Sequence, residues 1–116
     1  MALPTREQAE DEIAVELLRV HEESYGAGAS NVAVHVLEDS VLVILDLEVT
    51  EAERTMLEGG KGEAVRRMRE DYQEVIGPTF IAVVERATGR RVNGFVSRMN
   101  VDPAYSVEVF RLATPS

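Results

Sequence analysis

Apolar residues near the N-terminus recur every three or four positions, as they do along one face of a helix. A capping box formed by Thr5 and Gln8 precedes them, and Gly26 and Gly28 follow them. Acidic side chains crowd the first half of this segment, where the helix dipole favours negative charge. The pattern predicts an amphipathic helix of about six turns. Its apolar stripe comprises Ala9, Ile13, Leu17 and Val20.

The next segment alternates in the manner of strands. Residues 32–37 and 41–49 are rich in valine and leucine and flank a polar turn at residues 38–40, which predicts an antiparallel hairpin. In the second strand, Leu42 and Ile44 face away from the set Val41, Val43, Leu45, Leu47 and Val49. A strand that is apolar on both faces needs cover on both. We therefore expect Leu42 and Ile44 to lie at an interface.

Two further helices and a second hairpin complete the chain. Thr50 and Glu53 form another capping box, and the short helix that they open ends at Gly59-Gly60. A helical period then runs to Gly89, and the continuity of the period across Gly77-Pro78 favours a kinked helix over two separate ones. Residues 91–101 and 105–112 alternate around a turn at residues 102–104, and Gly94 suggests a bulge.

This order predicts an α+β fold with the sequence α-ββ-α-α-ββ in one domain spanning residues 1–116. The two hairpins join most simply as one four-stranded antiparallel sheet, with helices mainly on one face.

The charge and the amino-acid composition indicate which partners and which cellular compartment to expect. The net charge is −9, and residues 1–58 hold 14 acidic and 3 basic side chains against 7 and 9 in residues 59–116. An acidic surface repels phosphate backbones, so we expect no nucleic acid partner. Cysteine is absent, which excludes disulfides and thiolate metal sites and agrees with a cytoplasmic location. The longest apolar run, residues 41–45, is too short for insertion into a membrane.

A candidate ligand site lies at the start of the long helix. Gly60, Lys61 and Gly62 open this helix, and helix N-termini attract anions; Arg66 and Arg69 could assist through their guanidinium groups. The competing interpretation is a flexible joint whose arginines pair with nearby glutamates. Arg69 stands out because it shares a helical turn with Met68 and Tyr72. The loop at residues 26–31 is a weaker anion candidate, since it follows a helix and precedes a strand.

The sequence shows no recognisable catalytic or metal-binding constellation. His21 and His35 are the only histidines, and a metal site would need carboxylates to converge on both. Asp46 and Glu48 share one face of a strand, but strand ends are commonly polar and nothing else in the sequence favours a catalytic pair. We therefore expect a protein that is not an enzyme and that carries no metal and no cofactor.

Several segments resemble a bacterial family named after MpsC, a component of a sodium-translocating, membrane-potential-generating system linked to bicarbonate uptake. Arg69 in the long helix and Thr88-Gly89 at its end are part of the resemblance, which covers nearly the whole chain. Where the family often has a basic residue between two glycines and a proline after them, this chain has Ala27 and Ala29. The similar segments are Tyr25-Gly26-Ala27-Gly28, Val49-Thr50-Glu51-Ala52-Glu53-Arg54 and Val107-Glu108-Val109-Phe110-Arg111-Leu112.

The resemblance implies a small cytoplasmic accessory or regulatory protein associated with a membrane ion or bicarbonate transport system. It supplies no catalytic residues. The uncovered apolar positions Leu42 and Ile44 add the expectation of a homodimer. The alternative is a sensor of small anions or other small ligands that uses the helix start at residues 59–62 and the nearby arginines.

Overall fold

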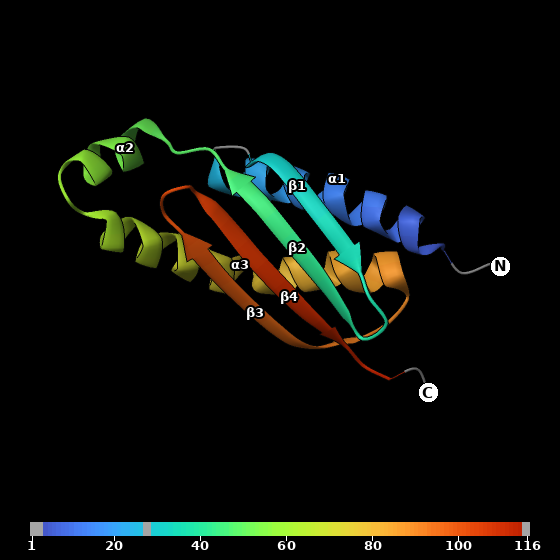
Figure 1. Ribbon diagram of the computed structural model, residues 1–116. Helices are drawn as coiled ribbons and strands as arrows, with labels where there is room; N and C mark the ends of the chain where they lie inside the picture. Colours follow the sequence, from blue (N-terminus) through green and yellow to red (C-terminus); the bar gives the residue numbers. More distant parts are fainter. Residues whose placement is uncertain (1–3, 27–28, 115–116) are drawn as a thin grey trace.

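A computed structural model describes residues 4–26 and 29–114 of the protein. Three helices and four strands alternate in the predicted order, which confirms the α+β class (Figure 1). The helices are α1 (Arg6–Tyr25), α2 (Glu51–Glu58) and α3 (Gly62–Thr88). The strands are β1 (Ala29–Val36), β2 (Ser40–Leu47), β3 (Val92–Asn100) and β4 (Tyr105–Leu112).

The two hairpins form a single antiparallel sheet with the strand order β1-β2-β4-β3. The second strand of each hairpin lies at the centre, where β2 pairs with β4 from Ser40 opposite Arg111 to Asp46 opposite Tyr105. This pairing confirms that the two hairpins merge into one sheet. It also leaves β1 and β3 as the two edges.

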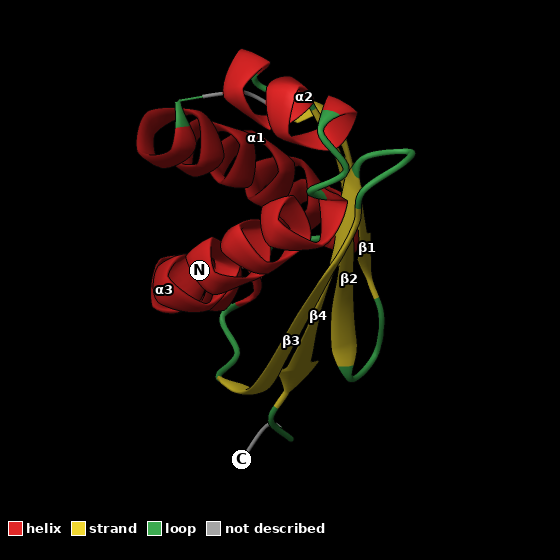
Figure 2. Ribbon diagram, turned by 90° about the vertical axis from the view of Figure 1, so that its left-hand side faces the viewer, coloured by secondary structure: helices red, strands yellow, loops and turns green. Residues whose placement is uncertain are grey.

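All the helices in the described part of the chain leave one face of the sheet uncovered. Figure 2 shows α1 and α3 side by side against one face, with α2 beyond the end of the sheet. The predicted placement of the helices on one face is therefore confirmed.

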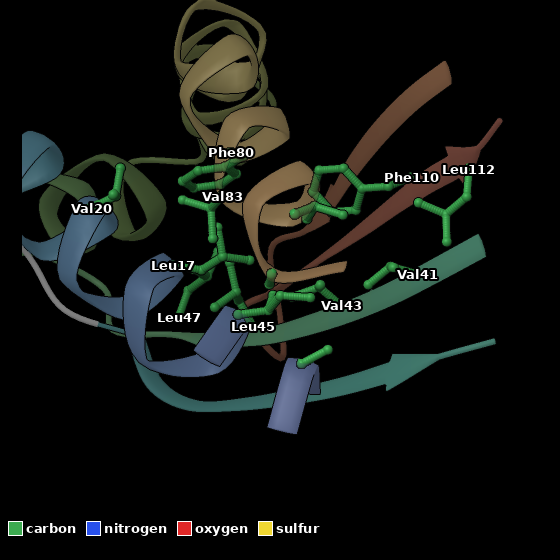
Figure 3. Packing of buried hydrophobic residues seen from close by; sticks show 14 of the residues in the cluster. Leu17, Val20, Val41, Val43, Leu45, Leu47, Phe80, Val83, Phe110 and Leu112 are labelled. Carbon is green, nitrogen blue, oxygen red and sulfur yellow. The ribbon is translucent and has the colours of Figure 1, made fainter. Parts of the chain in front are cut away.

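The core lies between the sheet and the helices α1 and α3 (Figure 3). The face of β2 that carries Val41, Val43 and Leu45 is fully buried, as the alternation predicted. Burial of each such aliphatic side chain contributes about 1.5–3 kcal/mol to the free energy of unfolding. Opposite them lie Ile13 and Leu17 from α1, and Phe80 and Val84 from α3.

Most of the predicted local signals are present. Both capping boxes form, at Thr5 with Gln8 and at Thr50 with Glu53. The register between β3 and β4 shifts between Val92 and Gly94, which confirms the bulge.

The helix α3 runs through Pro78 as one element, as the unbroken period favoured. The strand β1 begins at Ala29, three residues before the predicted start at Val32, because Ala29 still pairs with Leu47. Ala27 and Gly28, from the predicted loop, lie outside the described residues.

Candidate functional site

The uncovered face of the sheet has an apolar centre. The register places Ile44 beside Val107 and Leu42 beside Val109, so that the centre spans both middle strands. Ala33 on β1 pairs with Ile44, and Val96 on β3 pairs with Val109. Val96 is 59% exposed, whereas the other apolar side chains of this centre are half-buried. We call these six side chains the open face: Ala33, Leu42, Ile44, Val96, Val107 and Val109.

Opposite charges lie at the two ends of the open face. Asp46 follows Ile44 at one end of β2, and its carboxylate accepts a hydrogen bond of 3.4 Å from the Asn31 amide. At the other end, Arg111 lies opposite Ser40 and is exposed. The face therefore has an acidic side chain at one end, a basic one at the other and an apolar centre, which the exposed Arg98 and His35 flank on β3 and β1.

A buried ion pair links α2 to α3. Nε and Nη2 of Arg69 donate hydrogen bonds to the two carboxylate oxygens of Glu53, and both distances are 2.6 Å. Nη2 of Arg69 also donates to the carbonyl oxygen of Glu48 at 2.9 Å. The side chains of Arg69 and Glu53 are only 1% and 4% exposed. The arginine that the sequence singled out is therefore fully buried.

Tyr25, the last residue of α1, contacts both members of this ion pair and so links α1 to the other two helices. Its hydroxyl donates to Oε2 of Glu53 at 2.5 Å, and its ring lies 4.1 Å below the guanidinium carbon of Arg69. Burial opposes ionisation of Glu53, but hydrogen bonds from Arg69, from the Thr50 backbone N–H and from Tyr25 outweigh it and lower the pKa of Glu53 to about 2. Burial and the Glu53 hydrogen bond raise the pKa of Tyr25.

Aromatic side chains surround this cluster. The Tyr72 ring packs edge-on against Tyr25, with centroids 4.8 Å apart, and its hydroxyl shares a hydrogen bond with Ser24. His21 stacks on Tyr25 and meets Tyr72 edge-on. The C-terminal end of α1 is thereby locked against α3.

A second buried carboxylate lies on the inner face of β4. Glu108 is fully buried and accepts hydrogen bonds from the hydroxyls of Ser97, at 3.1 Å, and Ser106, at 3.3 Å. Burial raises the pKa of Glu108 to about 7, although the two serine hydrogen bonds act in the opposite direction. Unlike Glu53, Glu108 receives no arginine among the described residues.

The residues of the predicted anion site lie in the first turns of α3, but both of its arginines are engaged. Gly60 adopts a positive φ of 78°, and Lys61 caps the helix without a side-chain hydrogen bond. Arg66 pairs with Glu63 and, at 2.7 Å, with Glu70. Arg69 is committed to Glu53. Gly62 occupies the first turn of the helix.

The two histidines do not converge. His21 is buried on α1, whereas His35 is exposed on β1 and lies opposite Leu42, not opposite Asp46 or Glu48. In the part of the chain that the structure describes, no group of three or more histidine or acidic side chains is arranged to hold a metal ion.

The sequence did not reveal the partners of Arg69 or the burial of Glu108. The Thr50–Glu53 capping box was visible, but the second role of Glu53 depends on the packing of α2 against α3. For Glu108 a signal was available. It shares the parity of Phe110 and Leu112, whereas Tyr105, Val107 and Val109 lie on the uncovered face.

Comparison with known proteins gives one match. The model of the family described as "Na+-translocating membrane potential-generating system (MpsC)" matches residues 5–114 of the 116-residue chain. No curated protein and no solved structure shows significant similarity to the chain. None of the described helices combines the length and apolar character that crossing a bilayer requires. Because the match extends over all seven helices and strands of the structure, the chain belongs to the MpsC family.

Proposed function

We propose that this protein is a non-catalytic accessory component of a Na+-translocating, membrane-potential-generating system and that it works through association. The family match supports the connection with such a system. In this proposal the protein resides in the cytoplasm and forms a homodimer through its open face. A dimer built in this way leaves α1, α2 and α3 on its outer surface.

The open face is the observation that carries the proposal. It presents six apolar side chains from all four strands, and no described helix covers it. The four strands are eight or nine residues long. With a rise of about 3.3 Å per residue and a spacing of about 4.8 Å between strands, one face of the sheet has an area of roughly 500 Å². Stacking two copies would bury roughly 1,000 Å², which reaches the lower range of specific interfaces.

Charge favours a second copy as the occupant. A twofold axis that runs across the strands, between two stacked sheets, places the Asp46 end of one copy over the Arg111 end of the other. The contact is then self-complementary, because each copy supplies both charges. Sheets that stack face to face in this manner are common in proteins.

The arrangement around the buried Glu53 supports a structural role for this cluster over a catalytic one. Glu53 accepts hydrogen bonds from Arg69, Tyr25 and the Thr50 backbone, which occupies both of its oxygens. A general base needs a free lone pair directed at its substrate. This cluster instead ties three helices together.

Sensing of small anions at residues 59–62 has less support. Arg66 and Arg69 already face carboxylates of the same chain, so that a bound anion would have to displace Glu63, Glu70 or Glu53. Lys61 and Arg67 are the exposed cations that remain near this helix start among the described residues.

The proposal is tested in cells that lack this protein. We expect their Na+-dependent membrane potential, measured with a voltage-sensitive dye, to fall and to recover with the wild-type chain. Ile44→Glu should fail to restore it, because it places charge at the centre of the open face. The matched control is Val75→Glu, at a position on α3 that is 81% exposed. A membrane potential that does not change when the protein is lost contradicts the proposal.

A further inference from the structure

Glutamates from the helices accept hydrogen bonds from backbone N–H groups on the two edge strands of the sheet. On β3, Oε2 of Glu70 accepts the Met99 N–H at 3.1 Å, and Oε2 of Glu85 accepts the Val92 N–H at 2.9 Å. On β1, Oε2 of Glu10 accepts the Val36 N–H at 2.8 Å. Free N–H groups on an edge strand invite another strand, and proteins commonly block them.

Two outward N–H groups in the middle of β3, those of Phe95 and Ser97, have no such glutamate. Alternate residues of an antiparallel strand direct their N–H groups to the same side. Since the Met99 N–H points away from β4, the N–H groups of Ser97 and Phe95 point to the same outer edge; the register between β3 and β4 is continuous across these residues. Within residues 4–26 and 29–114, no side chain accepts a hydrogen bond from either group.

A groove of about 440 Å³ lies beside these two N–H groups, between α3 and the outer edge of β3. Its volume falls within the range of small-ligand pockets. Glu70 in the groove is bound to Arg66 and to Met99. The carboxylates of Asp71 and Glu74 are exposed and make no ion pair with a described residue. The lining residues are Glu70, Asp71, Glu74, Gly77, Pro78, Ile81, Phe95 and Ser97.

We propose that this edge receives a short extended segment of another protein, which adds to the sheet beside β3. Backbone carbonyls of the segment accept the N–H groups of Phe95 and Ser97, in the manner of strand addition. A Lys or Arg side chain of the segment lies against Asp71 and Glu74, and an apolar side chain covers Ile81 and Phe95. The segment is short because Glu70 and Glu85 occupy the N–H groups at either end.

A second copy of this chain fits the edge poorly. Pairing of β3 with another β3 would bring the acidic walls of two copies together, and like charges without partners cost binding free energy. The edge therefore differs from the open face in both its location and its partner.

The test uses a fluorescent hexapeptide in which Lys, Val and Lys alternate with Thr, so that Lys and Val share one face. We expect binding by fluorescence anisotropy, and a weakening of about tenfold or more in the variant Asp71→Asn/Glu74→Gln. The matched control, Asp11→Asn/Glu12→Gln, removes the same charge from exposed positions on α1 and should bind as the wild type does. Equal loss of affinity in both variants would reduce the effect to net charge and overturn the proposal.

Hydrogen exchange provides the second measurement. Bound peptide should slow the exchange of the Phe95 and Ser97 amides and leave those of Val92 and Met99 unchanged. Unaltered Phe95 and Ser97 amides at saturating peptide would contradict strand addition. Ile44→Glu should not alter the affinity for the peptide, which separates this inference from the homodimer. A change of oligomeric state in Asp71→Asn/Glu74→Gln would assign the edge to a second copy and overturn the inference.

Discussion

Arg69 on α3 and Glu53 on α2 form a bidentate ion pair in which both N–O distances are 2.6 Å and both side chains are almost fully buried. The helix α2 is only eight residues long, and Glu53 is the one residue in it that is buried. Short helices have little stability of their own, so tertiary contacts must hold them. This pair is therefore what positions α2 beside α3.

Removal of one partner of this pair should be costly. Arg69→Met leaves the Glu53 carboxylate buried without its cation, and we expect the free energy of unfolding in urea to fall by about 3–5 kcal/mol. Glu53→Gln should also destabilise, and the double variant should lose less than the sum of the two single losses. Arg66→Met, which breaks a more exposed pair, should have a far smaller effect. Additive losses would contradict a direct coupling.

The stability should depend on pH through Glu108. Its pKa is about 7 in the folded protein against 4.5 as the ordinary value, so the folded state binds the extra proton between these values. The contribution of Glu108 therefore becomes less favourable as the pH rises from 4.5 to 7, with a total loss of at most about 3 kcal/mol. Tyr72 on α3, whose pKa is also raised by burial, titrates above this window.

Glu108→Gln keeps the shape and stays uncharged, and it should remove this dependence. We expect the variant to unfold at higher urea than the wild type at pH 8 and at similar urea at pH 4. A wild-type advantage at pH 8 would show that the buried carboxylate is stabilising in its charged form.

Gly77 permits the close approach of α3 to β3. A Cβ atom at this position would lie 3.0 Å from Cε2 and 3.3 Å from Cδ2 of Phe95, and the Phe95 ring is already packed on Phe110. Glycine to alanine inside a helix normally stabilises by about 1 kcal/mol. Here the displacement of the ring should reverse the sign, with a loss of up to about 2 kcal/mol on thermal unfolding.

Gly62→Ala is the matched control, because the nearest atom to its Cβ is Cδ2 of Leu57 at an ordinary 3.5 Å. This variant should be neutral or slightly stabilising. A stabilised Gly77→Ala protein would show that the ring of Phe95 moves without cost.

The fold was predictable because periodicity reports which face of each element is buried. The alternation of Val41, Val43 and Leu45 fixed the inner face of β2, and the two capping boxes fixed where α1 and α2 begin. The joining of the two hairpins in one sheet was also predicted, whereas the strand order β1-β2-β4-β3 was not. Each of these signals is local, and each depends on only a few consecutive residues.

The candidate sites were only partly predictable. Leu42 and Ile44 marked the open face because they are apolar at positions opposite a core face. The contact between Arg69 and Glu53 joins two separate helices, and no spacing along the chain encodes it. The N–H groups of β3 that stay without an acceptor are those that the glutamates of α3 do not reach. Only the packing of α3 against β3 determines which these are.

Sedimentation of the wild-type chain and of Ile44→Glu, at micromolar concentrations, tests the association through the open face most directly. We predict a dimer for the wild type and for Val75→Glu, and a monomer for Ile44→Glu with an unchanged fold by circular dichroism. A wild-type protein that sediments as a monomer at every concentration, or a dimer that Ile44→Glu leaves intact, would contradict the account.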